Sequence, residues 1–359
     1  MKILIIGAGA IGCLVGGKLA LAGHEVTLAG RPRFAAAVQV QGLLLHDIDG
    51  AHVVRNVVAV GAIAEAFASA EARFDAAIIT VKSYHTEGAI AELVAAAQGG
   101  GASSPACVLS LQNGIGNEAM IATTVGAEHV IAGTITTPVI VAAPGVIVVE
   151  KPDPCIGLSP WSPATAKALL TNLAAALRTA GFAVRRYGDA AAMKWTKLLM
   201  NMVANATCAI LDESPATAFA HPGVVDLELA AWREALAVMR RAGIQPVNLG
   251  PYPFRILAPL IRTLPNAILR PILRRWVADA RGNKMPSLHI DLHSSREQSE
   301  IHWLNGAIVE KGQEVGIATP VNTALTRTLC ALVAREDDLA EWRHNHQRLI
   351  AAVRATPRI

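Results

Sequence analysis

The sequence predicts two domains of different fold class, an α/β N-terminal domain over residues 1–188 and an all-α C-terminal domain over residues 189–359. At 359 residues, the chain exceeds what a single hydrophobic core usually organises. In the first half, short runs of β-branched residues alternate with helical stretches, which is typical of a doubly wound parallel sheet with helices on both faces. In the second half, apolar residues recur every three to four positions, which indicates helices.

Five short apolar runs in the first half are the expected strands. They cover Ile3–Ile6, His24–Leu28, Asp75–Val81, Val108–Leu111 and Phe182–Arg186. The apolar stretch Ile11–Ala22 is the first expected helix, and Gly23 ends it before the second strand. The uncharged run Val130–Val149 is long enough to span a bilayer. Its glycines and prolines interrupt any single helix, so we interpret it as strands.

Three stretches of the second half have helical spacing: Ala190–Leu211, Val224–Arg241 and Ser294–Val315. Asp189 precedes an alanine-rich run, where the N-cap of a helix belongs, and it marks the expected domain boundary at about residue 188. A Pro- and Arg-rich insert occupies residues 245–285. It is either a basic amphipathic segment that lies on a membrane or a partner, or a Pro-kinked helical insert that packs on the second domain. We favour the packed insert.

The composition limits the classes of function. Hydrophobic residues make up 52% of the chain and charged residues 17%, which supplies a core and excludes intrinsic disorder. Aromatic residues, at 4%, are too few to stack on single-stranded nucleic acid, and the net charge of +4 suits a small anionic ligand. No secretory signal is visible, so we expect a cytoplasmic protein. The five cysteines are scattered, so we expect neither a disulfide framework nor a zinc knuckle.

A glycine-rich turn follows the first expected strand and leads into the first expected helix. Its sequence is Gly7-Ala8-Gly9-Ala10-Ile11-Gly12. In such a motif the first glycine permits a tight turn, the second lets the backbone approach a pyrophosphate, and the third lets the helix pack closely on the strand. The N-terminus of the following helix also attracts phosphate. We therefore expect a dinucleotide-binding site, the alternative being a glycine turn without function.

The end of the second expected strand indicates which dinucleotide binds. In NAD-binding domains, an acidic residue at this place accepts hydrogen bonds from the ribose. Here the strand ends Leu28-Ala29-Gly30-Arg31-Pro32-Arg33, without a carboxylate. Because a guanidinium pairs bidentately with a 2′-phosphate, we expect NADP, with Arg31 as the contact and Arg33 as the less favoured substitute. The alternative is that each arginine is a solvated loop charge.

Polar residues also follow the third and fourth expected strands, where ligands of doubly wound sheets lie. Lys82 comes directly after the third strand and can neutralise a cofactor phosphate. Asn113 follows the fourth strand and precedes Gly114, so its amide could face the nicotinamide or the substrate. A loop asparagine before glycine is equally a simple turn former.

The second half carries polar residues on an otherwise apolar helix. Lys197, Asn201 and Asn205 recur every four positions and would share one helix face. They form either the wall of a polar pocket, a solvent-facing stripe or a satisfied network between helices. By itself, Glu300 would be a surface carboxylate. His289, Asp291 and His293 have helical metal-ligand spacing, but without the zincin glutamate and a defined third ligand we expect no metal site.

Together these motifs resemble those of the ketopantoate reductase family, the 2-dehydropantoate 2-reductases. The resemblance rests on residues 7–12, Arg31, Val81-Lys82, Gln112-Asn113-Gly114, Trp195 with Lys197, Asn201 and Asn205, Pro286-Ser287, Glu300-Ile301 and Asn305-Gly306. It runs in order from residue 1 to about residue 325. It implies an N-terminal Rossmann domain, a helical C-terminal domain, and NADPH-dependent reduction of ketopantoate to pantoate in pantothenate and coenzyme A biosynthesis.

The resemblance also implies roles for individual residues. Lys197 would be the general acid, Asn113 would serve cofactor and substrate, and the residues that hold the substrate would be Asn201, Asn205, Ser287 and Glu300. We expect a small anionic 2-keto acid as the partner, no nucleic acid and no membrane, and we leave a homodimer open. One rival is a reductase of the same family for another 2-keto or hydroxy acid. The other is a non-enzymatic sensor of NADP redox state, which would need no proton donor such as Lys197.

Overall fold

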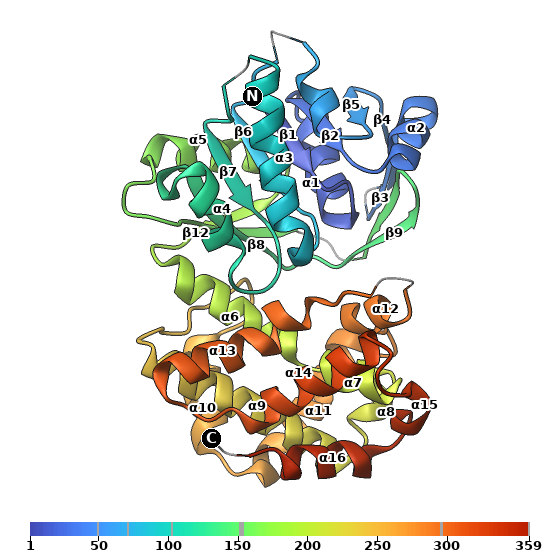
Figure 1. Cartoon of the computed structure of the whole chain (residues 1–359), viewed down its shortest axis with the longest axis vertical. Coiled ribbons are helices and arrows are strands. Elements are labelled where there is room, and N and C mark those ends of the chain that lie inside the picture. The colour runs from blue at the N-terminus through green and yellow to red at the C-terminus, as the bar shows by residue number, and fades with distance from the viewer. Residues whose placement is uncertain (49, 70–71, 102, 151–153, 295–296, 358–359) are drawn as a thin grey trace. The chain divides into compact units, whose positions relative to one another are not determined.

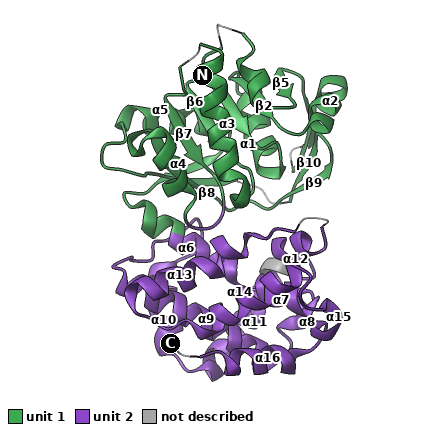
Figure 2. Ribbon diagram, viewed as in Figure 1, with its two compact units in different colours: residues 1–112, 116–194 green, residues 113–115, 195–359 purple. Residues whose placement is uncertain are grey.

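The computed structural model describes residues 1–48, 50–69, 72–101, 103–150, 154–294 and 297–357. The chain divides into two compact units (Figures 1 and 2). Unit 1 comprises Met1–Gln112 and Gly116–Lys194, and unit 2 comprises Asn113–Ile115 and Trp195–Ile359. The boundary between the units therefore falls inside the helix α6 (Ala190–Met202), a few residues beyond the boundary expected at about residue 188. The chain also leaves unit 1 for three residues, 113–115, and then returns to it.

Unit 1 is built on an eight-stranded sheet. In spatial order its strands are β12 (Ala183–Arg186), β11 (Cys155–Pro160), β8 (Val130–Ile135), β7 (Cys107–Ser110), β6 (Ala76–Ile79), β1 (Lys2–Ile6), β2 (Glu25–Ala29) and β5 (Val57–Val60). The five strands expected from the sequence are present, with ends shifted by at most two residues. Side chains along β1 alternate between two apolar cores, Ile3 and Ile5 in one, Leu4 and Ile6 in the other.

The expected parallel sheet is in fact mixed, because β11 pairs antiparallel with β8 while the other neighbouring strands are parallel. The chain between β8 and β11 forms strands rather than a crossover helix, so β11 can return beside β8 in the opposite direction. These strands belong to a second, four-stranded sheet, in the order β4 (Gly50–Val54), β3 (Leu43–Asp47), β10 (Val146–Val149) and β9 (Val139–Ala143). The interpretation of Val130–Val149 as strands is confirmed.

Helices cover both faces of the large sheet, as expected. The helical segments of unit 1 are α1 (Ala10–Leu21), α2 (Pro32–Gln41), η1 (Ala64–Phe67), η2 (Ser83–His85), α3 (Thr86–Gly99), α4 (Asn117–Val125), η3 (Ala127–His129) and α5 (Lys167–Thr179). Leu14 of α1 and Leu173 of α5 lie in the core of one face. Leu93 of α3 and Ile121 of α4 lie in the core of the other face. Apolar material on both faces explains why the strands are apolar without alternation.

Unit 2 is helical over its described residues. Its helices are the end of α6 (Ala190–Met202), then α7 (Ala206–Leu211), α8 (Pro215–Ala218), α9 (Pro222–Arg241), α10 (Phe254–Thr263), α11 (Asn266–Arg281), α12 (Ser287–Leu292), η4 (Glu300–Trp303), α13 (Asn305–Val315), α14 (Pro320–Val333), α15 (Leu339–Trp342) and α16 (His346–Ala355). The long helix α9 contacts α10, α11, α13, α14 and α16. It is therefore the centre around which unit 2 packs.

One expected helix of unit 2 is shorter than predicted. The stretch Ser294–Val315 becomes helical only at Asn305, where α13 begins, and η4 precedes it as a 3-10 turn. Residues 295–296 of that stretch lie outside the described residues. Ser299 explains the short turn, because its hydroxyl accepts a bond from the backbone N–H of Ile301. A serine side chain that bonds to the backbone in this way favours the start of a helical segment at that point. The turn η4 is therefore separate from α13.

The Pro- and Arg-rich insert is helical and packs on unit 2, which confirms the favoured interpretation. Pro259 lies inside α10 and Pro271 inside α11, and both helices contact α9. Arg233 of α9 donates hydrogen bonds to the carbonyls of Ile261 and Leu264, which ties the turn between α10 and α11 to α9. Among the described residues, no helix is both long and apolar enough to cross a membrane.

Candidate functional site

The glycine-rich turn after β1 has the backbone that a dinucleotide site requires. Gly7 has a φ of +105°, and a Cβ there would lie 2.6 Å from the backbone nitrogen of Val81. A Cβ at Gly12 would lie 2.1 Å from the carbonyl oxygen of Gly7. Gly9 differs, because it is exposed and a Cβ there would meet nothing within 4 Å. The space beside Gly9, at the N-terminus of α1, fits the pyrophosphate of a dinucleotide.

Two side chains that the sequence analysis did not assign hold this turn in place. The Thr80 hydroxyl donates to the carbonyl of Gly7 at 2.6 Å, and the Cys13 thiol donates to the carbonyl of Ala8 at 3.4 Å. Burial raises the pKa of Cys13 to about 12, so the thiol stays protonated and remains a donor. Thr80 stands directly after β6, so its position at a strand end was the signal that could have identified it.

The residues after β2 lie next to the glycine turn. A Cβ at Gly30 would lie 2.7 Å from the Cβ of Ala8, which places the two loops in contact. Arg31 follows as the N-cap residue of α2, and both Arg31 and Arg33 are exposed. Lys82 follows the neighbouring strand β6 and is half-buried. Two cationic side chains, Arg31 and Lys82, thus follow the carboxyl ends of β2 and β6, on either side of β1 and its glycine turn.

A buried polar network lies beyond the ends of β6 and β7. The Gln112 amide donates to the carbonyl of Val81 at 3.0 Å and to the hydroxyl of Thr86 at 2.7 Å. Thr86 in turn donates to Asn117 at 2.9 Å. Each of these polar groups is buried and satisfied by another, which makes the loops rigid. From the sequence, Gln112 was expected only as part of the motif Gln112-Asn113-Gly114, with no role of its own.

A buried ion pair lies next to this network in unit 1. The Lys194 ammonium lies 2.7 Å from Glu118 and donates to the carbonyl of Gln112 at 2.7 Å. Both side chains are almost completely buried, at 3% and 2% exposure. A buried pair of this kind is stable only with good geometry and added hydrogen bonds, which the Gln112 carbonyl supplies. These contacts explain why the first turn of α6 belongs to unit 1 although the rest of the helix belongs to unit 2.

The helix that was expected to carry the polar stripe is broken. The prediction of one helix over Ala190–Leu211 is wrong, because α6 ends at Met202 and α7 begins at Ala206. Ala204 adopts a left-handed φ of 53°. The Asn205 side chain donates to the carbonyl of Asn201 at 3.1 Å, the group that the Asn205 backbone N–H would bond in a continuous helix. The asparagine side chain therefore takes the acceptor that the backbone would have used.

The break leaves Asn113, Asn201, Asn205 and Ser287 in one hydrogen-bonded chain within unit 2. The Asn201 amide donates to the Asn113 side-chain oxygen at 2.9 Å. The Asn205 amide also lies 3.5 Å from the Ser287 hydroxyl, and the Asn205 oxygen accepts from the backbone N–H of Leu288 at 3.1 Å. These four predicted substrate residues come from three separate parts of the sequence. The arrangement presents amide and hydroxyl groups that can bind a polar ligand.

Lys197 and Glu300 are buried, at 9% and 6% exposure. Lys197 lies on α6 one turn before Asn201, and Glu300 is the first residue of η4. The loop at residues 113–115 packs directly on η4, because the Ile115 N–H donates to the carbonyl of Trp303 at 2.9 Å. Contacts therefore connect α6, the Asn113 loop and the element that carries Glu300. Charged groups are buried in this way only when their surroundings compensate them.

Comparisons with known proteins identify the family of this chain. A family model described as ketopantoate reductase PanE/ApbA matches residues 3–157, and the model of its C-terminal part matches residues 189–333. A 2-dehydropantoate 2-reductase of Halobacterium salinarum is 30% identical over 337 residues, which cover 93% of this chain and 98% of that protein. The chain belongs to the ketopantoate reductase family. A second relative of the same name, from Pyrococcus horikoshii, is 29% identical and covers 90% of this chain and 95% of its own.

Solved structures of the family have the same fold. A PanE/ApbA family ketopantoate reductase from Ralstonia eutropha superposes with a TM-score of 0.76 at 28% identity, over 94% of this chain and 99% of that one. D-mandelate dehydrogenase, solved with NADH and anilino(oxo)acetate, also reaches a TM-score of 0.76, at 23% identity over 93% of this chain and 99% of that one. The ketopantoate reductase family consists of pyridine-nucleotide-dependent oxidoreductases that act on CH–OH groups. The predicted family and fold class are confirmed.

Proposed function

We propose that the protein reduces ketopantoate to pantoate with NADPH, a step in the formation of pantothenate and coenzyme A. The observation that carries the proposal is the chain of Asn113, Asn201, Asn205 and Ser287 in unit 2, with buried Lys197 one turn away. Amides and a hydroxyl suit the carboxylate and hydroxyl of a small hydroxylated keto acid. The relatives named 2-dehydropantoate 2-reductase support the same substrate.

The residues of unit 1 would bind the cofactor. The turn at residues 7–12 would receive the pyrophosphate at exposed Gly9, Lys82 would neutralise phosphate, and Arg31 would pair with the 2′-phosphate. Asn113 would reach the nicotinamide end as well as the substrate. When bound, the reduced nicotinamide supplies the hydride that adds to the 2-keto carbon. This assignment makes NADPH the preferred cofactor because no acid follows β2 to hold a free ribose hydroxyl.

Lys197 would carry the proton chemistry. As the 2-keto carbon is reduced, negative charge grows on the carbonyl oxygen, and an ammonium at hydrogen-bond distance stabilises that charge and then donates its proton. Glu300 would position Lys197 and accept a bond from the substrate hydroxyl. Asn201, Asn205 and Ser287 would hold the substrate so that the carbonyl oxygen faces Lys197. In this scheme the buried surroundings strengthen each electrostatic contact, because little water competes for it.

Steady-state kinetics over a panel of 2-keto acids, each with NADPH and with NADH, test the proposed function. We expect ketopantoate with NADPH to give the highest kcat/KM of the panel. A higher kcat/KM with another 2-keto acid would instead favour the rival reductase of the same family. The fold shared with D-mandelate dehydrogenase makes an aryl keto acid a useful member of the panel. Binding of NADPH without its oxidation by any substrate would favour the sensor.

A further inference from the structure

A cluster of two histidines and one carboxylate lies in unit 2, among residues that the proposed reaction does not use. His289 Nε2 lies 2.7 Å from Asp212 Oδ1, and His293 Nε2 lies 3.2 Å from the same oxygen. The two imidazole rings are 4.2 Å apart between centroids. One ligand atom from each residue lies within 4.8 Å of the other two. Within the described part of the chain, this is the one such group of three.

The local structure explains why these side chains converge. His289 lies on α12 and His293 is its C-cap residue four positions later, so the two side chains lie on one face. Asp212 follows α7 directly and adopts a left-handed φ of 51°, which a short polar residue tolerates best. Because α7 packs on α12, the carboxylate comes to the face that carries both imidazoles. The sequence analysis considered Asp291 as the acidic member, but the structure supplies Asp212, 77 residues away from His289.

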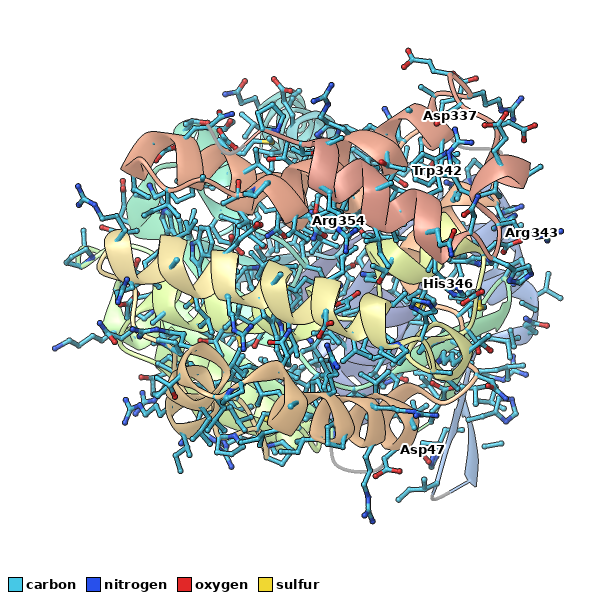
Figure 3. All side chains as sticks on the ribbon, turned by 90° about the horizontal axis from the view of Figure 1, so that it is seen from below. Asp47, Asp337, Trp342, Arg343, His346 and Arg354 are labelled. Carbon is cyan, nitrogen blue, oxygen red and sulfur yellow. The ribbon has the colours of Figure 1, made fainter. Side chains whose placement is uncertain are left out.

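The second oxygen of Asp212 has a different partner. The Arg343 guanidinium donates to Oδ2 through Nε at 2.7 Å and through Nη2 at 2.5 Å. Arg343 follows α15, its side chain is 59% exposed, and it is labelled at the right-hand side of the view in Figure 3. Both nitrogens contact the same oxygen, Oδ2, which leaves Oδ1 to the two imidazoles. An outer contact of this kind commonly orients a ligand of a metal ion.

We propose that Asp212, His289 and His293 bind one divalent transition-metal ion of the zinc type. Zinc is bound by imidazole nitrogen and carboxylate oxygen at about 2.0–2.2 Å, which puts ligand atoms of a tetrahedral site about 3.3 Å apart. The spacings of 2.7 and 3.2 Å from Asp212 Oδ1 to the two nitrogens need only small side-chain rotations to reach that value. His293 is 41% exposed, so water can complete the coordination.

A neighbouring cluster has the same chemistry and serves as a control. The next residue, Glu213, accepts bonds from His344 Nδ1 at 2.9 Å and from His346 Nε2 at 3.0 Å, one at each carboxylate oxygen. The His346 ring is also stacked on His221, with centroids 4.5 Å apart. Here each oxygen has its own histidine, so three ligand atoms do not surround one point. The comparison separates an arrangement suited to metal from a pair of ordinary ion pairs.

The site is independent of the proposed function, although it touches the same helices. Asn205 is the N-cap of α7 and Ser287 begins α12, whereas Asp212 and His293 lie just after the C-terminal ends of the two helices. A bound ion would thus connect Asp212 after α7 with His289 and His293, and His289 lies two residues after Ser287 on α12. Metal binding can be measured without any turnover, so failure of the reductase proposal would leave this test intact.

Metal titration of the tag-free, chelator-treated full chain tests the proposal. We expect Zn²⁺ to bind at one equivalent by calorimetry, and Co²⁺ at the same stoichiometry to give visible absorption bands of a four- or five-coordinate site. His289→Ala and His293→Ala should each weaken Zn²⁺ binding at least about tenfold. His344→Ala, the control from the Glu213 cluster, should leave the affinity within about twofold of the wild-type value.

Folding of each variant is checked by circular dichroism in the absence of metal. If His289→Ala unfolds, the more exposed His293→Ala carries the test. The proposal is overturned if the wild-type chain shows no saturable one-to-one binding of Zn²⁺ or Co²⁺. It is equally overturned if His293→Ala binds Zn²⁺ as tightly as the wild type, or if His344→Ala loses binding to the same extent.

Discussion

The two units prepare for a ligand by different means. In unit 1 the backbone defines the proposed cofactor site, because there is open space for a pyrophosphate beside Gly9 but none beside the Cα atoms of Gly7 and Gly12. In unit 2 side chains define the proposed ligand site, because the amides of Asn201 and Asn205 donate the hydrogen bonds that join Asn113, Asn201, Asn205 and Ser287, one of them to the backbone carbonyl of Asn201. A backbone site depends on the absence of a Cβ, whereas a side-chain site depends on what each Cβ carries. Substitutions at the glycines of unit 1 should therefore act through the volume of an added Cβ, and substitutions in unit 2 through the loss of a side-chain group.

The largest effect is expected in unit 2, at Lys197. Lys197→Ala removes the proposed proton donor and should lower kcat by about 100-fold to 10,000-fold, while NADPH affinity changes little. Steady-state kinetics and fluorescence titration of NADPH measure the two quantities. Lys311→Ala is the matched control, because Lys311 is a partly exposed lysine of the same unit, paired with Glu314 at 2.5 Å. An unchanged kcat in Lys197→Ala would remove this residue from the mechanism.

In unit 1, two neighbouring glycines should respond in opposite ways. Gly12→Ala places a Cβ 2.1 Å from a backbone oxygen, so the turn must shift, and we expect a loss of roughly 3 kcal/mol in the free energy of unfolding. Gly9→Ala meets open space and should keep the wild-type stability, yet weaken NADPH binding where the pyrophosphate approaches. Chemical denaturation and NADPH titration separate the two effects. Equal stability losses in both variants would contradict the proposed role of Gly9.

Arg31 refines the comparison between the two units, because this side chain of unit 1 is expected to distinguish NADPH from NADH. Arg31→Ala should raise the KM for NADPH by about 10-fold to 100-fold, the worth of a charge-assisted hydrogen bond, and leave the KM for NADH nearly unchanged. Arg33→Ala, also exposed, is the control. If both cofactors lose affinity equally in Arg31→Ala, the contact with a 2′-phosphate is excluded.

The smallest effect concerns the insert on unit 2 and depends on pH. Asp226 of α9 accepts two bonds from Arg270 of α11, at 2.7 and 2.5 Å, and these contacts hold the pKa of the carboxyl below its usual value. The pair therefore stabilises the folded chain above the unfolded pKa of about 4, and this contribution is lost as the pH falls through the lowered pKa. Asp226→Asn should reduce stability at pH 7 but less at pH 3.

Thermal unfolding at both pH values measures this difference. The loss at pH 7 should be smaller than that of Gly12→Ala, because both side chains of the Asp226–Arg270 pair are partly exposed. Asp279→Asn provides the control, since Asp279 forms a 3.8 Å ion pair with Arg275 in which both side chains are highly exposed. A stability difference that grows as the pH falls would contradict the assigned direction.

Much of the fold could be predicted because its signals are local. The strands β1, β2, β6 and β7 follow from short apolar runs, and α9 follows from its regular apolar spacing. The prediction failed where a single residue overrides a periodic pattern. Ala204 and the Asn205 side chain break the helix after Met202, although the apolar spacing continues through Leu211. Neither the strand β11 nor its antiparallel direction was predicted, and the direction depends on what the chain between β8 and β11 forms.

The candidate site, like the fold, could be predicted from the sequence only where its signals are local. The glycine turn and the residues after β2 and β6 were recognised from motifs only a few residues long. Contacts across unit 2 could not be found by spacing, because Asn205 and Ser287 are 82 residues apart, and Asn113 and Asn201 are 88 apart. Spacing and position had singled out Asn113, Asn201 and Asn205 one by one, and only the resemblance to a known family added Ser287 and grouped the four. It included Gln112 only within a motif and gave no indication of Thr80 or Asp212, and the roles of all three come from hydrogen bonds seen only in the folded chain.

The short excursion at residues 113–115 has a consequence for anyone who cuts or recombines this chain. A gene fragment that starts at Trp195 would encode nearly all of unit 2 but would lack the tripeptide whose Ile115 amide bonds the Trp303 carbonyl. A chimera of two related chains joined at Trp195 would keep Asn113 from one parent and Asn201 from the other. Parents that differ at either position would then produce a mismatched hybrid, even if each half folded correctly.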